Sequence, residues 1–309
     1  MSSGLAIEAT GLTKRFGQRV AVDALNLAVP RGTVYGFLGP NGSGKTTTIR
    51  MLVGLLRPTA GSASLLGHDI RRDLIAGLRE TGAQVESPAF VSNLSGRRNL
   101  EYLGALTLGR VPAALVDQAL ARVRLTGRDR DRVRTYSQGM KARLGLAQAL
   151  LCQPRLLILD EPTNGLDPQG MHEVRELIRH LAAEDGMTVF ISSHLLAEVQ
   201  QLCDRVAILR RGQAVAEGPV AELLSSAGRL RIAVDEPDGV DAAALVAEVD
   251  GVQIVAREDG YLRLAAPPEQ AAEINRRLVS AGVAVGELVI ERQSLEDFYL
   301  DVTGREAQL

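Results

Sequence analysis

The chain has 309 residues, of which 46% are hydrophobic and 23% charged, with 12 prolines. This length and composition predict one or two folded domains and exclude a disordered or fibrous chain. The longest stretch without Asp, Glu, Lys or Arg, residues 32–44, is shorter than the ~20 residues of a membrane span. The first residues also lack the pattern of a secretory signal. We therefore expect a chain without a transmembrane helix that stays in the cytoplasm.

The net charge of −2 is unevenly distributed. Residues 1–225 carry 27 Lys and Arg against 21 Asp and Glu, a net charge of +6, whereas residues 226–309 carry 8 against 16, a net charge of −8. The two cysteines, Cys152 and Cys203, lie in apolar or helical segments, which is typical of reduced, buried thiols. We predict two regions of different electrostatic character in a reducing compartment.

The strongest motif is G-x-x-x-x-G-K-[ST], which runs from Gly39 to Thr46. It follows an apolar run suited to a buried strand, 34–38, and precedes a helical pattern, 46–53. In such a loop, backbone N–H groups and the helix N-terminus bind a polyphosphate. We expect Lys45 to bridge the β- and γ-phosphates and the Thr46 hydroxyl to ligate Mg²⁺. The expected nucleotide-binding residues of this motif are Gly39, Pro40, Asn41, Gly42, Ser43, Gly44, Lys45, Thr46 and Thr47.

A second pattern lies downstream, where the apolar run 156–159 is followed by Asp160 and Glu161. Such a run predicts a central parallel strand that is buried on both faces. Ligands bind at the carboxyl ends of strands in open α/β sheets, so Asp160 is placed to reach a metal ion and Glu161 the attacking water. We expect Glu161 to act as the general base or to orient that water.

Three further patterns occur in a fixed order relative to the phosphate loop and the strand that ends in Asp160 and Glu161. Residues 136–140 read Tyr-Ser-Gln-Gly-Met before a helical pattern, Asp167 follows the Asp-Glu strand, and 192–194 read Ser-Ser-His after another apolar strand. Alone, a serine before a helix is first of all an N-cap, and a histidine after a strand is first of all structural. In this order, however, the patterns resemble the nucleotide-binding subunit of an ATP-binding cassette (ABC) transporter, over residues 5–225.

The resemblance implies a role for each of these residues. Ser137 and Gly139 belong to the signature motif, which closes over the γ-phosphate held by a second copy in a head-to-tail dimer. Asp167 contacts that second copy, and His194 senses the γ-phosphate. Phe16 matches the aromatic residue that stacks on adenine. The implied ligands are ATP and Mg²⁺.

Two features depart from the family pattern. The signature reads Tyr-Ser-Gln-Gly-Met where many members have Leu-Ser-Gly-Gly-Gln, a variant that resembles the antibiotic-resistance branch of bacterial exporters. A glutamine that ligates Mg²⁺ is expected near residue 85. The distance from this ligand to the downstream segment 93–95 places it at Glu86. A glutamate there would add a negative charge to the site. Gln84 would share a strand face with Glu86, so both stay candidates and Glu86 is favoured.

The coarse pattern favours an α/β fold. Strands and turns surround the phosphate loop in 5–66, helical patterns fill 92–152, and strand, helix and strand return in 156–217. This suits the P-loop NTPase fold of an ABC cassette, with a mixed β core and a helical subdomain that carries the signature. From Leu230 the order becomes β-α-β-β-α-β, which is typical of a small α+β ferredoxin-like unit, and a short capped helix follows at 294–300.

These patterns predict two domains, a cassette at 1–225 and an acidic accessory domain at 226–309. The resemblance implies a Mg²⁺-dependent ATPase on the cytoplasmic face of the membrane, which powers export through a separate polytopic permease. The cargo would be a drug, an antibiotic or a lipid-like molecule. The alternative is a soluble ABC ATPase that acts on nucleic acid or ribosomes. Against it stand one cassette rather than two and the absence of a strongly basic patch, so no nucleic-acid partner is expected. A phosphate-loop kinase or GTPase would not need the Ser-x-Gly helix or His194.

Overall fold

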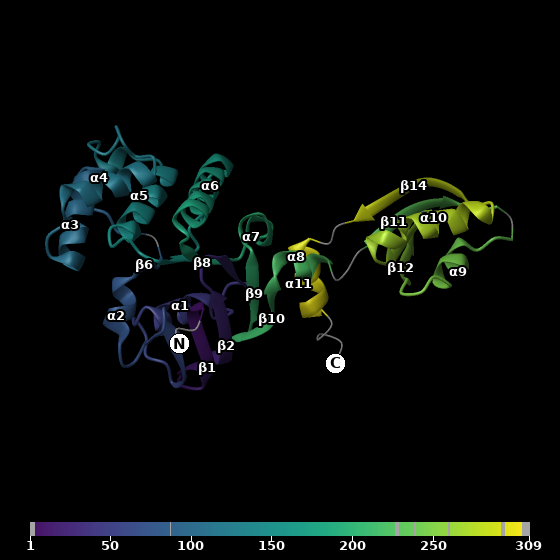
Figure 1. Cartoon of the computed structure of the whole chain (residues 1–309), viewed down its shortest axis with the longest axis horizontal. Coiled ribbons are helices and arrows are strands. Elements are labelled where there is room, and N and C mark those ends of the chain that lie inside the picture. Colours follow the sequence, from purple (N-terminus) through teal and green to yellow (C-terminus); the bar gives the residue numbers. More distant parts are fainter. Residues whose placement is uncertain are drawn as a thin grey trace. The chain divides into compact units, whose positions relative to one another are not determined.

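The computed structural model describes residues 4–86, 88–225, 229–237, 239–258, 260–291 and 294–304 (Figure 1). The chain divides into two compact units, Met1–Glu217 and Gly218–Leu309. This division falls before helix α8 (Val220–Ser225), whereas the sequence pattern suggested a boundary after it. Within these described ranges, no helix combines the length and the apolar character that a membrane crossing requires.

A six-stranded sheet forms the centre of the first unit, with the strand order β10-β9-β3-β8-β7-β6. Its strands are β3 (Val34–Leu38), β6 (Thr81–Gln84), β7 (Leu156–Asp160), β8 (Thr188–Ser193), β9 (Arg205–Arg210) and β10 (Gln213–Pro219). Strands β3, β7 and β8 are parallel neighbours and are buried along their whole length, which explains their continuous apolar runs. The parallel pairing brings the carboxyl ends of these strands to one edge of the sheet.

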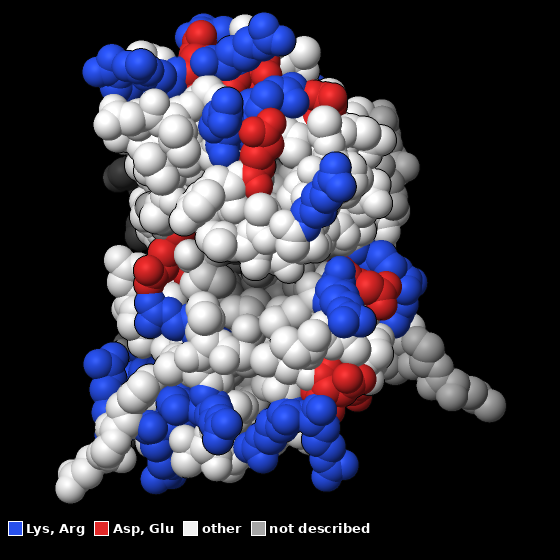
Figure 2. Space-filling model, turned by 90° about the vertical axis from the view of Figure 1, so that its left-hand side faces the viewer, with Lys and Arg blue, Asp and Glu red and all other residues white. Residues whose placement is uncertain are grey.

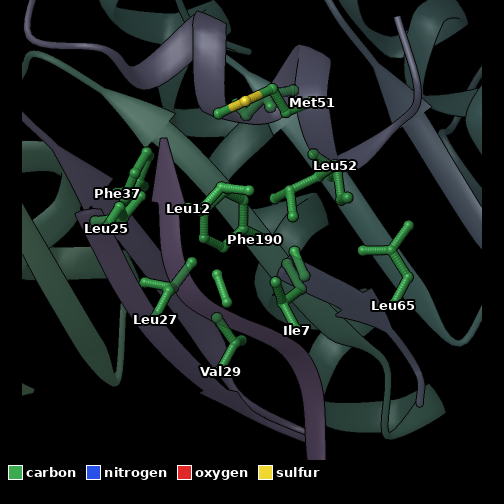
Figure 3. Close-up of a cluster of buried hydrophobic side chains, with 14 of the residues drawn as sticks. Ile7, Leu12, Leu25, Leu27, Val29, Phe37, Met51, Leu52, Leu65 and Phe190 are labelled. Atoms are coloured by element: carbon green, nitrogen blue, oxygen red, sulfur yellow. The ribbon is translucent and has the colours of Figure 1, made fainter. Parts of the chain in front are cut away.

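A second, antiparallel sheet has the order β2-β1-β4-β5. Its strands are β1 (Leu5–Phe16), β2 (Arg19–Pro30), β4 (Ala60–Leu65) and β5 (His68–Asp69). Buried side chains of this sheet, such as Ile7 and Leu27, pack with Met51 and Leu52 of helix α1 (Lys45–Leu52) and with Phe190 of β8 (Figure 3). This shared core fixes α1 between the two sheets, and with it the loop that precedes the helix.

The remaining helices of the first unit are α2 (Leu74–Arg79), α3 (Gly96–Leu108), α4 (Ala113–Arg122), α5 (Gln138–Leu150), α6 (Pro168–Asp185) and α7 (Leu196–Leu202). Helices α3, α4 and α5 pack against one another and form the helical region that the sequence predicts. Helices α3, α5 and α6 begin at Ser95, Ser137 and Asp167, whose side chains each accept a hydrogen bond from a backbone N–H three residues later. These N-caps explain where the three helices start.

The second unit follows the predicted order β-α-β-β-α-β. Its elements are β11 (Arg229–Asp235), α9 (Ala242–Ala247), β12 (Gln253–Glu258), β13 (Tyr261–Ala265), α10 (Ala271–Ser280) and β14 (Ala284–Glu291). The sheet has the order β12-β13-β11-β14, and its neighbouring strands are antiparallel. Its core includes Ile232, Leu264 and Leu278. The predicted C-terminal helix is α11 (Leu295–Gly304), whose start is capped by Ser294.

Candidate nucleotide-binding site

The phosphate loop connects β3 to α1 as the motif predicts. Gly44 ends the loop with a φ of 110°, in the left-handed region, and a Cβ added to it would lie 2.6 Å from the carbonyl oxygen of Ala21. No other residue fits there without strain. Helix α1 has neither a side-chain cap nor an acidic residue in its first turn. Its first N–H groups and its positive dipole end are therefore available to an anion.

The Ser43 hydroxyl supports binding of a polyphosphate at this loop. Its Oγ is buried and has no hydrogen-bond partner among the described residues. Buried polar atoms are almost always paired, and a phosphate oxygen would accept this hydrogen bond. The loop borders a cavity of about 340 Å³, whose lining includes Asn41, Gly42, Lys45, Thr46 and Thr47. The residues present therefore fit a nucleoside polyphosphate.

Lys45 lies at the centre of the charged groups. Its side chain is only 5% exposed, and its Nζ donates a hydrogen bond to the carbonyl oxygen of Gly39 at 2.7 Å. The carbonyl oxygen of Pro40 lies 3.4 Å from the same Nζ, and Glu161 Oε1 lies 3.3 Å from it. A buried ammonium group needs such partners, and it can exchange them for phosphate oxygens of higher charge.

Glu161 connects Lys45 to His194. Its backbone has a φ of 52°, and its N–H lies 3.2 Å from the carbonyl oxygen and 3.1 Å from the hydroxyl of Ser192 on β8. Its Oε2 lies 2.5 Å from Nδ1 of His194, and its side chain is 20% exposed. A non-glycine residue in this conformation is held by its surroundings, here by hydrogen bonds across two neighbouring strands. The carboxylate is thus fixed beside the cavity, where it can accept a proton from water.

Asp160 ends β7 and is 5% exposed. The Ser192 hydroxyl donates a hydrogen bond to its Oδ1, and the two residues are also register partners between β7 and β8. Asp160 lines a second cavity, of about 290 Å³, together with Thr46, Gln84 and Glu86. Hydroxyl, carboxylate and amide oxygens are the hard ligands that Mg²⁺ prefers, so this donor set fits the ion.

Gln84 and Glu86 reach this second cavity in different ways. Gln84 is the last residue of β6, and its buried Oε1 has no hydrogen-bond partner among the described residues. Glu86 lies beyond the strand with a φ of 64°, is exposed, and forms an ion pair with Arg50. Strand alternation does not extend to Glu86, because β6 ends at Gln84 and the backbone turns at Glu86, but both side chains line this cavity and both stay candidates.

Ser137, Gly139 and Asp167 lie at two helix starts, next to Gln138 and Leu166, which line the second cavity. Ser137 and Asp167 are exposed N-caps, which accept hydrogen bonds from the N–H of Met140 at 3.2 Å and of Gly170 at 3.0 Å. A Cβ added to the half-buried Gly139 would lie 3.7 Å from the Cα of Gly170, so the two helix starts are adjacent. None of the three expected residues lines either cavity described above.

Phe16, expected at the adenine, ends β1 and is 49% exposed, with Lys14 Nζ 5.1 Å from the centre of its ring. Sequence reasoning missed Ser192, which bonds to both Asp160 and Glu161, and Arg19, which lines the first cavity. Ser192 stood within the Ser-Ser-His pattern, and Arg19 stood three residues after the aromatic position. The structure therefore brings together Lys45, Thr46, Asp160, Glu161 and His194, as the motifs predict, and adds these two residues.

Known proteins resemble this chain over most of its length. Residues 22–164 match the ABC transporter family. The chain is 40% identical to the bacitracin transport ATP-binding protein BcrA of Bacillus licheniformis, over 96% of this chain and 97% of that protein. It is 39% identical to the daunorubicin resistance ATP-binding protein DrrA3 of Streptomyces coeruleorubidus, over 97% and 96% of the two chains.

A solved structure shares the fold of the first unit. The cbiO1 protein of Clostridium perfringens, part of the ABC transporter complex cbiONQ, superposes with a TM-score of 0.65 at 28% identity, over 72% of this chain and 91% of that chain. The comparisons agree with the geometry of this chain, which has the phosphate loop, the pair of Lys45 with Glu161 and the two sheets. The chain belongs to the ABC transporter family, among its ATP-binding, ATP-hydrolysing proteins.

Proposed function

We propose that this chain powers export by hydrolysing ATP as the subunit of a transporter whose permease is a separate membrane-spanning protein. The observation that carries the proposal is the position of Glu161 between Lys45 and His194 at the end of the phosphate loop. The names of the relatives, bacitracin transport and daunorubicin resistance, support a drug, antibiotic or lipid-like cargo. They give no support to an ATPase that acts on nucleic acid or ribosomes.

The hydrolytic step follows from the contacts of the site. Lys45 and the N–H groups at the start of α1 bind the β- and γ-phosphates. Glu161 orients a water molecule and accepts its proton as the water oxygen attacks the γ-phosphorus, and ADP leaves. His194 holds the Glu161 carboxylate, and in this proposal it also contacts the γ-phosphate.

Mg²⁺ would be held by the Thr46 hydroxyl and Asp160, with Gln84 or Glu86 as a further ligand. When bound, the ion neutralises charge on the phosphate oxygens. The hydrogen bond from Ser192 fixes the Asp160 carboxylate for this role. Asp160 is buried, so this orientation is already set before the ion binds.

A second copy of the chain completes the proposed site. Ser137, Gly139 and Asp167 lie at adjacent helix starts, outside both cavities of their own chain. In a head-to-tail dimer, the exposed start of α5 would close over the γ-phosphate that the other copy holds. Phe16 would stack on the adenine of its own chain's nucleotide, because half of its surface is exposed at the end of β1.

The permease is proposed to dock on the face that carries α2, α3 and α4. Figure 2 shows charged side chains of both signs at one end of this face and mainly Lys and Arg at the other, with a largely white, hollowed surface between them that carries a few charged groups. Helices α2 and α3 each expose large apolar side chains, among them Ile75 (66%), Tyr102 (53%) and Leu106 (70%). Large apolar side chains that a protein exposes together are typical of surfaces that bind another protein. This docking would hold the chain at the cytoplasmic face of the membrane.

The experiment that tests the proposal is purification of tagged Glu161→Gln chain from detergent-solubilised membranes of the native host, in the presence of ATP. This variant is expected to hold ATP and a polytopic membrane protein in near-equal amounts. Glu176→Gln, a change at a half-exposed position on α6 that lines neither cavity, is the matched control that keeps turnover. Recovery of ribosomes or DNA-associated proteins without a membrane protein would contradict the transport role and leave the ATPase role intact.

A further inference from the structure

Arg19 is a cation of the first cavity that the mechanism above does not use. It is the first residue of β2 and lines the cavity together with Lys45, Thr46 and His194. Its side chain is exposed, and it has no hydrogen bond or ion pair to any residue in the described part of the chain. Lys45, in contrast, is paired with Glu161. Arg19 therefore offers an uncompensated positive charge to whatever the cavity binds.

The hairpin geometry locates Arg19 between two parts of the expected nucleotide site. On the side where the adenine is expected, Arg19 is the register partner of Phe16 across the β1–β2 hairpin. On the side of the phosphate loop, Ala21 also lines the cavity, and its carbonyl oxygen lies against Gly44 of that loop. The pairing of β1 with β2 shifts by one residue at Ala21, between Arg15–Val20 and Lys14–Val22, and Arg19 and Ala21 both line the cavity. Arg19 thus lies between the aromatic ring and the phosphate loop.

We propose that the Arg19 guanidinium binds the α-phosphate of the nucleotide. This inference rests on the proposed function, in which Phe16 stacks on the base and the loop holds the β- and γ-phosphates. The α-phosphate is the charged group between those two ends of the nucleotide. A guanidinium fits it through charge-assisted hydrogen bonds. The contact is independent of the γ-phosphate, so it stabilises ATP and ADP alike.

The test compares the affinity of the full-length chain for ADP and for a non-hydrolysable ATP analogue, by isothermal titration calorimetry with Mg²⁺ present. Arg19→Ala is expected to raise both dissociation constants by about tenfold, the effect of losing one hydrogen bond to a charged group. Arg19→Lys should recover part of this loss. Arg15→Ala is the matched control, because Arg15 is an exposed arginine of the same hairpin that does not line the cavity. It should bind both nucleotides like the unaltered chain.

The outcomes separate this inference from the proposed function. If the unaltered chain binds neither nucleotide, the proposed function fails. If it binds both and Arg19→Ala binds them equally well, the inference about Arg19 is overturned while the proposed function stands. If Arg19→Ala weakens only the triphosphate analogue, Arg19 contacts the γ-phosphate and the assignment to the α-phosphate is wrong. Equal weakening by Arg15→Ala would mean that only the overall charge of the hairpin matters, which also contradicts the contact.

Discussion

The motifs of the ATPase pattern fall in two regions, the carboxyl ends of β3, β7 and β8 and the starts of α5 and α6. The two regions differ in how buried their polar side chains are and in what these side chains contact. At the strand ends, Glu161 contacts both Lys45 and His194, and Lys45 is buried. At the helix starts, Ser137 and Asp167 are exposed and bond to the backbone of their own helices. The first region is organised within one chain, whereas the second presents its polar groups outward.

Burial explains the difference. A buried charge must be paired, so the folding of the two sheets itself fixes the positions of Lys45 and Asp160. An exposed N-cap needs only one backbone N–H to stabilise its helix, and the rest of its surface stays free. The strand-end site, which consists of Lys45, Asp160, Glu161 and His194, can therefore be tested in a single chain. The helix-start site, which consists of Ser137, Gly139 and Asp167, can be tested only when a second copy of the chain binds there.

The largest effect is expected from Glu161→Gln, which removes the base and keeps the size of the side chain. ATP hydrolysis should fall by about 10²- to 10⁴-fold, the usual contribution of a general base. ATP affinity should persist, because Lys45 and the phosphate loop are unchanged. Phosphate release and nucleotide titration measure the two quantities, with Glu176→Gln as the control. Full turnover by Glu161→Gln would contradict the role of the strand-end site.

A smaller effect is expected from Ser137→Ala, for which the chain provides a matched control in Ser95→Ala. Both serines are N-caps whose side chains accept a backbone hydrogen bond at 3.2 Å. Each variant should therefore lose about 1 kcal/mol in its free energy of unfolding. If Ser137 also donates to the γ-phosphate of a second copy, only Ser137→Ala should lose ATPase activity, by about tenfold.

Urea unfolding and steady-state ATP hydrolysis of Ser137→Ala and Ser95→Ala measure this difference. The affinity of the isolated chain for ATP should stay the same in both variants, because neither serine lines the nucleotide cavity. Equal ATPase rates in the two variants would mean that Ser137 is only a helix cap. The contrast between the two regions of the molecule would then lose its functional meaning.

The sequence could predict those parts of the site that depend on local backbone geometry. Gly44 had to be glycine because its φ is 110° and the carbonyl oxygen of Ala21 lies close by, so the loop leaves a readable motif. The buried run of β7 marked Asp160 and Glu161 in the same way. The order of strands and helices in the second unit also followed from local patterns.

Contacts between distant segments and irregular turns could not be predicted in this way. Ser192 bonds to Asp160 across 32 positions of sequence, and only the pairing of β7 with β8 brings the two together. Glu86 and Gln84 could not be told apart because the argument assumed a continuing strand, whereas the backbone turns at Glu86. The position of Arg19 three residues after Phe16 could not by itself place it in the cavity, because that depends on how the hairpin folds beside the phosphate loop.

The smallest effect is expected from Tyr35→Phe, on the strand that leads into the phosphate loop. Tyr35 is fully buried, and its hydroxyl donates a hydrogen bond to Glu217 Oε1 at 2.6 Å. Loss of this bond should lower the free energy of unfolding by about 1 kcal/mol. The ring should keep its place, because it stacks on Phe190 with 5.8 Å between the centroids. ATPase activity should be unchanged, since Tyr35 contacts none of the strand-end residues and lines neither cavity.

The pH dependence of this stability difference tests its cause. Burial raises the pKa of Tyr35 above its ordinary value of ~10, because the charged phenolate would be desolvated beside Glu217. A folded-state pKa above the unfolded one means that the stabilisation is complete below pH ~10 and declines as pH rises beyond it. The difference between the unaltered chain and Tyr35→Phe, measured by urea unfolding, should therefore be constant from pH 6 to about 9. If Tyr35→Phe instead lowers ATPase activity without changing stability, the Tyr35–Glu217 bond positions β3 for catalysis, and the strand-end site is not organised by its own contacts alone.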